Sequence, residues 1–360
     1  MELGGPVFDH RHYVPILRWK RAEWVALRHL KPEDRARITP LVEITPRSVT
    51  PGTRRPTIGQ MLQKNAEDMA ENWGRSRLFV DLWHVEHLSD CDGLHPFVYL
   101  AQQARRCRVE FIPVAGLGRL PAYQAAVASI VAEDGRGLCF RLLSTDLARP
   151  ALRQDLLDLL SSLKVNFGQV DLVVDFQYVQ GACPDLATVV ASVPHLNDWR
   201  SLTIASGAFP RDLRSFSVGE HPLPRLDWQA WLRLMRLGGQ PTRRPSYGDY
   251  TIQHAIYGEP PERPNFSASI RYAAGDYWVI MRGAGVFSDG SPGFAQWPAN
   301  ALRLCRRSDF RGEDFSYGDR YIGGMSQQTA QTGSAETWLR AGINHHLVFV
   351  ARQIANLFAT

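Results

Sequence analysis

The chain has few cysteines, and they are not spaced as in a disulfide framework or a zinc site. Its five cysteines, Cys91, Cys107, Cys139, Cys183 and Cys305, are scattered over 360 residues without a CxxC pair. Isolated cysteines of this kind are typical of buried thiols in a reducing compartment. We therefore expect a cytoplasmic protein.

Long hydrophobic runs are also missing. No apolar stretch approaches the roughly 20 residues that span a bilayer, and residues 1–13 lack the hydrophobic segment of a signal peptide. Hydrophobic residues make up 44% of the chain and charged residues 21%, which indicates a soluble globular protein with a large core and no membrane partner. The net charge of +5 allows an acidic partner but supports nucleic-acid binding only weakly.

The common catalytic motifs are absent as well. We find no glycine-rich phosphate loop, no dinucleotide fingerprint and no nucleophile elbow; Ser206-Gly207 lacks the preceding glycine that an elbow requires. These absences argue against ordinary NTPases, dehydrogenases and serine hydrolases.

The chain does contain eight short, β-prone apolar runs, with helical patterns between them. They lie at residues 14–20, 39–45, 77–82, 112–118, 138–142, 171–176, 202–207 and 249–254. Their number and alternation predict an α/β protein with a (β/α)8 TIM-type barrel over residues 1–257. A doubly wound open sheet is the alternative architecture, which the missing glycine-rich turn after the first strand disfavours.

A polar residue stands in or near the end of most of these runs. In such a barrel the carboxyl ends of the strands build the active site. We therefore expect a polar ring at the barrel mouth, and Lys20, two residues after Arg18, should point to the same side. The alternative is a structural network of ion pairs such as Arg18–Glu43 and Arg141–Asp175. The predicted ring consists of Arg18, Glu43, Asp81, Arg141, Asp175, Ser206 and His254.

The pattern changes after residue 257. Residues 258–266 are proline-rich and are typical of a linker or lid, and Ala274-Gly275-Asp276 indicates a β-hairpin. A short helix is expected near residues 298–307, and a long one follows Ser334 and runs to about residue 358. Residues 258–360 are thus predicted to form a C-terminal hairpin-plus-helix appendage packed on the barrel.

Several segments resemble the beta protein family, named after a T-even phage protein. They are "YVPILRWKRAEWVAL" and "PLVEI" near the start, then "RSLTIASGAFPRDL", "YGDYTIQH", "SASIRY" and "ETWLRAGINHHLVFVARQIA". The resemblance extends over essentially the whole chain. It implies a role in phage–host conflict, with antiphage defence as the expected context, and it supplies no catalytic residues.

Two hypotheses about function follow. In the first, the chain is a sensor or interaction component of a defence system, and the polar mouth binds a small ligand or a loop of a protein partner.

In the second, it is a phosphoester hydrolase, a nuclease or phosphodiesterase. Glu43, Asp81 and Asp175 would then hold Mg²⁺ or Mn²⁺, and His254 would act as general acid or base. The phosphate-binding residues would be Arg18, Lys20 and Arg141, with Ser206 as a further ligand-binding residue. A cation among the carboxylates would favour the hydrolase, whereas carboxylates held by arginine would not.

Two pairs of histidines lie close together in the sequence and are candidate metal ligands. His84 and His87, in "DLWHVEH", lie near a metal-ligand spacing but lack the second half of a zinc motif. His345 and His346 lie about 100° apart on the predicted terminal helix. They cannot share one ion from one helix face, and hydrogen bonds that dock the helix are the favoured interpretation.

Overall fold

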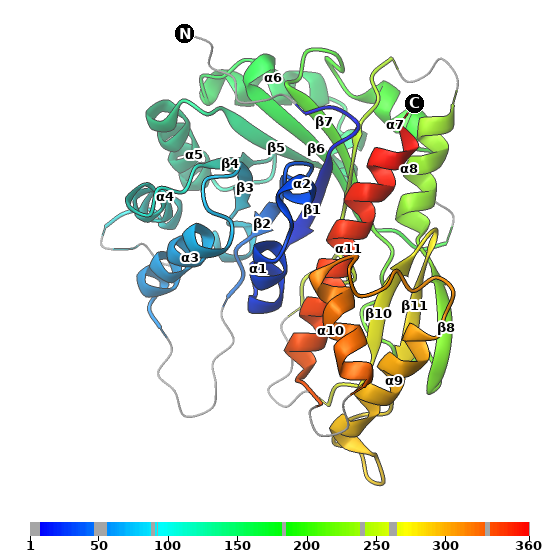
Figure 1. Ribbon diagram of the computed structural model, residues 1–360. Coiled ribbons are helices and arrows are strands. Elements are labelled where there is room, and N and C mark those ends of the chain that lie inside the picture. The colour runs from blue at the N-terminus through cyan, green and yellow to red at the C-terminus, as the bar shows by residue number, and fades with distance from the viewer. Residues whose placement is uncertain are drawn as a thin grey trace.

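The computed structural model describes residues 8–46, 56–87, 91, 93–181, 185–237, 242–258, 265–327 and 332–359. Eight parallel strands close into a barrel in the order β1-β2-β3-β4-β5-β6-β7-β9 (Figure 1). The predicted (β/α)8 barrel is therefore confirmed. The strands are β1 (Tyr13–Leu17), β2 (Leu41–Glu43), β3 (Leu78–Asp81), β4 (Phe111–Ala115), β5 (Leu138–Leu143), β6 (Val170–Tyr178), β7 (Ser201–Gly207) and β9 (Ser246–Asp249).

One predicted strand was misplaced. The expected run at residues 249–254 begins where β9 ends. The Asp249 carboxylate accepts a hydrogen bond from the backbone N–H of Thr251 at 2.9 Å, and Thr251 has a φ of 58°. This local turn, which an aspartate side chain favours, ends the strand and places His254 in the loop that follows.

Helices cover the outside of the barrel, and their ends follow local sequence signals. In α3 the Thr57 side chain accepts a hydrogen bond from the N–H of Gln60, and α5 begins at Pro121 and ends at Gly135, whose φ is 65°. The helices before the extension are α1 (Arg21–Arg28), α2 (Pro32–Arg35), α3 (Ile58–Asn72), α4 (Pro96–Arg106), α5 (Pro121–Asp134), α6 (Leu152–Ser162), α7 (Leu186–Ser192) and α8 (Leu226–Arg236).

The alternation of side chains along the strands builds the barrel interior. In β6, Val173 belongs to the inner apolar cluster, whereas Leu172 and Val174 belong to the cluster between strands and helices. Asp171 and Asp175 therefore share the inward face with Val173, one at each end of the strand. The inner apolar layer thus separates a polar layer at the start of the strands from another at the mouth.

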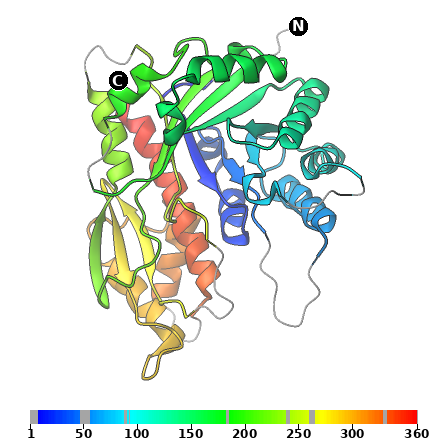
Figure 2. The ribbon, with the colours of Figure 1, turned by 180° about the vertical axis from the view of Figure 1, so that it is seen from behind.

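A second, smaller sheet lies beside the barrel (Figure 2). Its antiparallel order is β10-β11-β8, with β8 (Gly219–Pro224), β10 (Ile270–Ala274) and β11 (Tyr277–Arg282). The predicted hairpin turns at Gly275, whose φ is 64°. Helices α9 (Gln296–Cys305) and α10 (Tyr317–Ser326) cover this sheet with a core of their own. Because β8 precedes residue 258, segments from both sides of the predicted domain boundary build this sheet.

The terminal helix α11 (Ala335–Leu357) has the place of the eighth barrel helix, packed against α1 and β1 as well as β10 (Figure 1). Asn344 donates to the carbonyl of Ala26 at 2.9 Å. His345 contacts Asp319 and His346 contacts Asp249, each at 2.8 Å and fully buried. The two histidines therefore join the helix to different carboxylates. The division of the chain into a barrel over residues 1–257 and an appendage over residues 258–360 stays a prediction.

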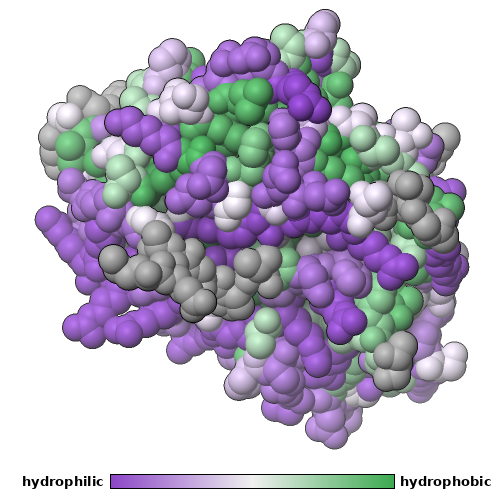
Figure 3. Space-filling view, turned by 90° about the horizontal axis from the view of Figure 1, so that it is seen from above, coloured by the Kyte–Doolittle hydropathy of each residue, from purple (hydrophilic) through white to green (hydrophobic). Residues whose placement is uncertain are grey.

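Cys107, Cys139 and Cys305 are free thiols, and Cys183 lies outside the described residues. In the part of the chain that the structure describes, no helix combines the length and apolarity needed to cross a bilayer. Seen from above, the molecule shows a broad band of hydrophilic residues next to a hydrophobic area (Figure 3).

Candidate functional site at the barrel mouth

Arg141, projecting inward from β5, is the centre of the mouth. Its Nη1 donates to Glu43 Oε1 at 2.8 Å and to Asp81 Oδ2 at 2.9 Å. Its Nε and Nη2 donate to Asp175 Oδ2 at 2.9 and 2.7 Å. Nη2 also donates to the hydroxyl of Tyr250 at 2.8 Å. One guanidinium thus joins carboxylates from β2, β3 and β6.

Burial and neighbouring charges shift the pKa values of Arg141 and Glu43 in opposite directions. Arg141 and the three carboxylates are each no more than 2% exposed. Burial alone would lower the pKa of Arg141, but Tyr250 and the carboxylates raise it well above its ordinary value. Burial would likewise raise the pKa of Glu43, but Arg141, with smaller contributions from His84 and Arg18, lowers it to about 2. Arg141 and Glu43 are therefore both charged at neutral pH.

A second arginine closes one side of the mouth. Arg119, in the loop after β4, donates from Nη2 to both oxygens of Asp81 at 2.9 and 2.8 Å. The ring of Trp83 lies 5.0 Å from the guanidinium of Arg119 and 5.1 Å from that of Arg141. Such distances permit cation–π attraction. Asp81 is therefore shared between two arginines under an aromatic cover.

The outer edge of the cluster is less completely paired. Glu43 Oε2 lies 3.3 Å from His84 Nε2 and 3.9 Å from Arg18 Nε, and Arg119 Nη1 lies 3.9 Å from Glu86 Oε2. All these atoms are buried and lack a hydrogen bond among the described residues. Buried polar groups at such distances are costly unless water or a ligand joins them. This edge is thus the part of the mouth with unused hydrogen-bonding capacity.

The three carboxylates do not fit a shared divalent cation in this arrangement. The guanidinium of Arg141 occupies the space between them, with N–O distances of 2.7–2.9 Å. No set of three metal-binding side chains was found among the described residues. A cation shared by Glu43, Asp81 and Asp175 would first have to displace Arg141. The metal-dependent hydrolase stays a prediction, and no step of its chemistry follows from this geometry.

The remaining predicted residues lie around the cluster rather than in it. Arg18 and Lys20 approach the same ring, that of Tyr257, at 5.7 and 5.1 Å. Ser206 is buried in β7, and His254 lies beyond β9; neither is among the residues that Arg141 contacts. His254 Nδ1 lies 3.0 Å from the carbonyl oxygen of Phe209, and burial is the main cause that lowers its pKa.

Sequence reasoning missed several residues of the mouth. Arg119 follows β4, but the apolar run at residues 112–118 contributed no residue to the predicted ring. Tyr250 directly follows β9 and donates to Asp175 Oδ2 at 2.7 Å, whereas the misplaced strand directed attention to His254. A count from the true strand ends would have found Tyr250. Nothing in the sequence indicated that Arg119 reaches back to Asp81.

A cavity of about 910 Å³ opens beside the mouth, between the barrel and the extension. Arg18 and His254 belong to both the predicted ring and this cavity. Its charged lining consists of Arg18, Arg211, Arg214, Arg271, Arg282 and Asp212, and its aromatic lining consists of Phe266, Trp297 and Trp338. We call this cavity the arginine groove.

Arg271 is the distinctive cation of the arginine groove. It projects from β10, donates from Nη1 to the carbonyl of Ile252 at 2.8 Å, and its guanidinium lies 4.7 Å from the ring centre of Phe209. No described carboxylate lies within ion-pair distance of it. Burial lowers the pKa of Arg271 to about 10, so it stays charged at neutral pH. A partly buried cation whose contacts with Ile252 and Phe209 are uncharged favours an anionic ligand.

The comparison with protein families decides the relationship of the chain. The sequence pattern of the beta protein family matches residues 13–352, which include every barrel strand and most of α11. The chain belongs to the beta protein family. The resemblance noted in the sequence is thereby confirmed.

Individual relatives add no functional argument for this beta protein. No curated protein matches it. Among solved structures it is similar to PhdJ bound to a substrate intermediate, at 12% identity, a TM-score of 0.32, and coverage of 96% of this chain and 97% of that one. It is also similar to a putative alpha amylase from Salmonella typhimurium, at 11% identity, a TM-score of 0.25, and coverage of 95% and 70%.

Proposed function

We propose that this beta protein is a sensing component of an antiphage-defence system and that its arginine groove binds an acidic segment of a protein partner. The observation that carries the proposal is Arg271, a partly buried cation with no described carboxylate partner in a large cavity. Family membership supports the context of phage–host conflict.

The shape and lining of the arginine groove favour a peptide over a single small anion. Five arginines and one aspartate line it, so its charge complements an acidic chain. Asp212 lies 3.8 Å from Arg214, whose side chain is 90% exposed, so this pair neutralises the groove only weakly. Phe266, Trp297 and Trp338 add aromatic surface of the kind that anchors partner side chains.

The groove is also connected to the mouth. Arg18 donates to the backbone carbonyls of His254 and Ala255 and lies 3.9 Å from Glu43. A segment that engaged Arg18 would compete with Glu43 for it. Binding in the groove would then be transmitted to the less completely paired edge of the Arg141 cluster, which is how we propose that occupancy is sensed.

A peptide titration tests the binding step. Fluorescent peptides of equal length, one rich in glutamate and phenylalanine and one with lysine in place of glutamate, are titrated into the full chain. We expect only the acidic peptide to bind, and R271Q to weaken it by at least about tenfold, because a charge-assisted contact is lost. The control R233Q removes an exposed arginine of α8. Equal binding by R271Q and R233Q would refute the groove assignment.

A phage challenge tests the biological context separately. Bacteria that express the chain from its native locus are exposed to a panel of lytic phages, and the efficiency of plaquing is compared for wild type, R271Q and R233Q. We expect protection by wild type and R233Q but not by R271Q. Unchanged plaquing with wild type across the panel would count against a defence role, whatever the peptide titration gives.

A further inference from the structure

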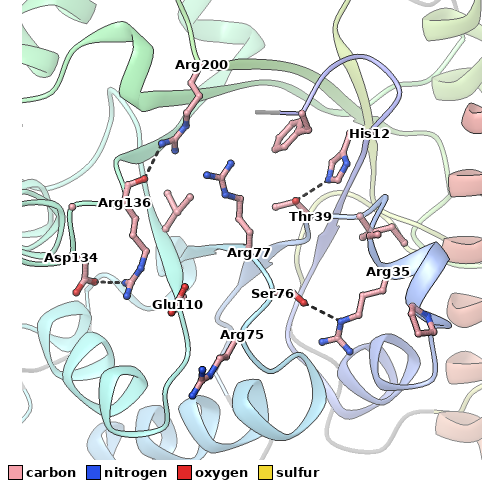
Figure 4. Close-up of a pocket in the computed structure, with 16 residues that line it drawn as sticks. His12, Arg35, Thr39, Arg75, Ser76, Arg77, Glu110, Asp134, Arg136 and Arg200 are labelled. Carbon is pink, nitrogen blue, oxygen red and sulfur yellow. Dashed lines mark hydrogen bonds and ion pairs between the residues drawn. The ribbon is translucent and has the colours of Figure 1, made fainter. Parts of the chain in front are cut away.

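The opposite end of the barrel holds a second arginine-rich cavity, of about 810 Å³ (Figure 4). It is formed by residues that precede the barrel strands. Among the described residues, five arginines, Arg35, Arg75, Arg77, Arg136 and Arg200, line it together with two acidic residues, Glu110 and Asp134. We call it the basal cavity. Neither the family relationship nor the mouth accounts for it.

Two carboxylates beside the basal cavity, those of Asp171 and Asp134, are each shared by two arginines. Asp171, buried at the start of β6, accepts from Arg200 Nε and Nη2 at 3.1 and 2.7 Å, and the same carboxylate lies 4.0 Å from Arg77 Nη1. Asp134 accepts from Arg105 at 2.8 Å and pairs with Arg136 at 3.1 Å. In the described lining of the basal cavity, arginines therefore outnumber carboxylates.

Two like charges are held close together as a result. Figure 4 shows the guanidinium groups of Arg77 and Arg200 near one another, in line with their common contact to Asp171 Oδ2. Their side chains are only 20% and 7% exposed, so water screens this repulsion incompletely. Burial lowers the pKa of Arg77; the charge of Asp171 opposes this lowering, and the neighbouring Arg200 adds a smaller lowering. An anion next to this pair would relieve the repulsion.

The rest of the lining is suited to the uncharged part of a ligand. His12 Nε2 lies 2.9 Å from Thr39 Oγ1, and burial, with a contribution from Arg77, lowers the pKa of His12 to about 4. The imidazole is therefore neutral at pH 7 and adds no further positive charge. Phe8, Ile38 and Ile112 supply apolar surface. The cavity volume lies within the range of about 300–1,000 Å³ that small-molecule sites have.

We propose that the basal cavity binds a small organic phosphate, with its phosphate groups held by Arg77 and Arg75 and its organic part against the apolar wall. A planar guanidinium group can donate two parallel hydrogen bonds to two oxygens of one phosphate, which makes arginine well suited to this ligand class. Arg75 is exposed at the edge of the cavity and would complete the contact with a terminal phosphate.

Calorimetric titration of the full chain tests this site. ATP, pyrophosphate, inorganic phosphate and adenosine are compared at constant ionic strength. We expect ATP to bind most tightly, the inorganic anions more weakly, and adenosine not measurably. R77Q should weaken ATP binding by at least about tenfold and R75Q by a smaller factor, because each loses a charge-assisted contact. The control R303Q removes an exposed arginine of α9 and should bind as wild type.

Three outcomes would overturn the proposal. The first is no binding of any phosphate probe beyond a matched chloride control, and the second is adenosine binding equal to ATP. The third is ATP binding unchanged in both R77Q and R75Q, which would place the anion elsewhere. Because Arg75 is exposed, R75Q keeps the test decisive even if R77Q does not fold. The proposal that the arginine groove binds an acidic peptide is tested separately with R271Q. If that proposal failed, the ATP titration of the basal cavity would still be decisive.

Discussion

Asp171 and Asp175 lie four residues apart on the same face of β6, yet they belong to opposite charge arrangements. At the mouth, three carboxylates converge on one guanidinium, that of Arg141. At the base, two guanidinium groups converge on one carboxylate, that of Asp171. Among the described residues, carboxylates therefore outnumber arginines in the cluster of Arg141, Arg119 and their three carboxylate partners, whereas arginines outnumber carboxylates in the lining of the basal cavity, with an apolar layer between the two ends.

This difference changes what each end can bind. The mouth already contains its counter-ion in Arg141, so it resembles a preorganised structural network whose outer edge alone has spare polar atoms. The described lining of the basal cavity has fewer carboxylates than arginines, so an added anion would improve its electrostatic energy. In TIM barrels, function is associated with the mouth and stability with the base. Here the charge balance suggests that the base has a binding role as well.

Removing the central cation should have the largest effect. R141M keeps much of the side-chain volume but leaves Glu43, Asp81 and Asp175 buried without Arg141. Breaking a buried ion pair from one side costs about 3–5 kcal/mol. We expect a loss of at least that size in the free energy of unfolding, measured by urea denaturation. The exposed-site control R303M should change it by less than about 0.5 kcal/mol. A loss below about 1 kcal/mol in R141M would show that the cluster is not a structural centre.

The matched pair D171N and D175N compares the two ends directly. D171N leaves Arg77 and Arg200 without their shared charge, and we expect the free energy of unfolding to fall by about 1–3 kcal/mol. Added phosphate should restore part of this loss, because it binds the native state next to the arginines. D175N should also be destabilised, but phosphate should not restore it beyond the effect of phosphate on wild type. Equal recovery in both variants would contradict the proposed difference.

The fold could be predicted because its signals are local and repeated. Apolar runs at regular intervals indicated the barrel, and Glu43, Asp81, Arg141 and Asp175 were identified from their positions near strand ends. The convergence of the three carboxylates on the guanidinium of Arg141 could not be predicted. It depends on barrel closure, which brings β2, β3, β5 and β6 around one axis, and on the reach of one long side chain. Tyr250 was missed because an aspartate turn ended β9 earlier than the β-prone sequence suggested.

The basal cavity was missed for a different reason. Arg77 and Arg200 directly precede strands, and Asp171 is the second residue of β6, but only the carboxyl ends of the strands were considered as a site. A search for charged residues at strand starts would have found these three. It would not have shown that Arg77 and Arg200 share Asp171, because their strands, β3 and β7, are not neighbours in the barrel.

The pH dependence of stability should distinguish the two ends with a smaller effect. The pKa of His12 falls from its ordinary value of 6.5 to about 4 in the folded chain, mainly through burial. Between pH 4 and pH 6.5, His12 therefore binds a proton more readily in the unfolded chain than in the folded chain. The contribution of neutral His12 to the free energy of unfolding is therefore fully present above pH 6.5 and is lost as pH falls through 4. The pKa of Glu43 is lowered from 4.5 to about 2, so its contribution is lost only below pH 4.5.

As pH falls, we therefore expect the stabilising contribution of His12 at the base to be lost at a higher pH than that of Glu43 at the mouth. In H12Q, the free energy of unfolding should fall less than in wild type between pH 6.5 and 4, by up to about 3 kcal/mol. E43Q should follow wild type through most of this range and differ in pH dependence mainly below pH 4.5. Urea denaturation at half-unit pH intervals measures both. Parallel curves for H12Q and wild type above pH 4.5 would mean that His12 is not held neutral by its buried position beside Arg77.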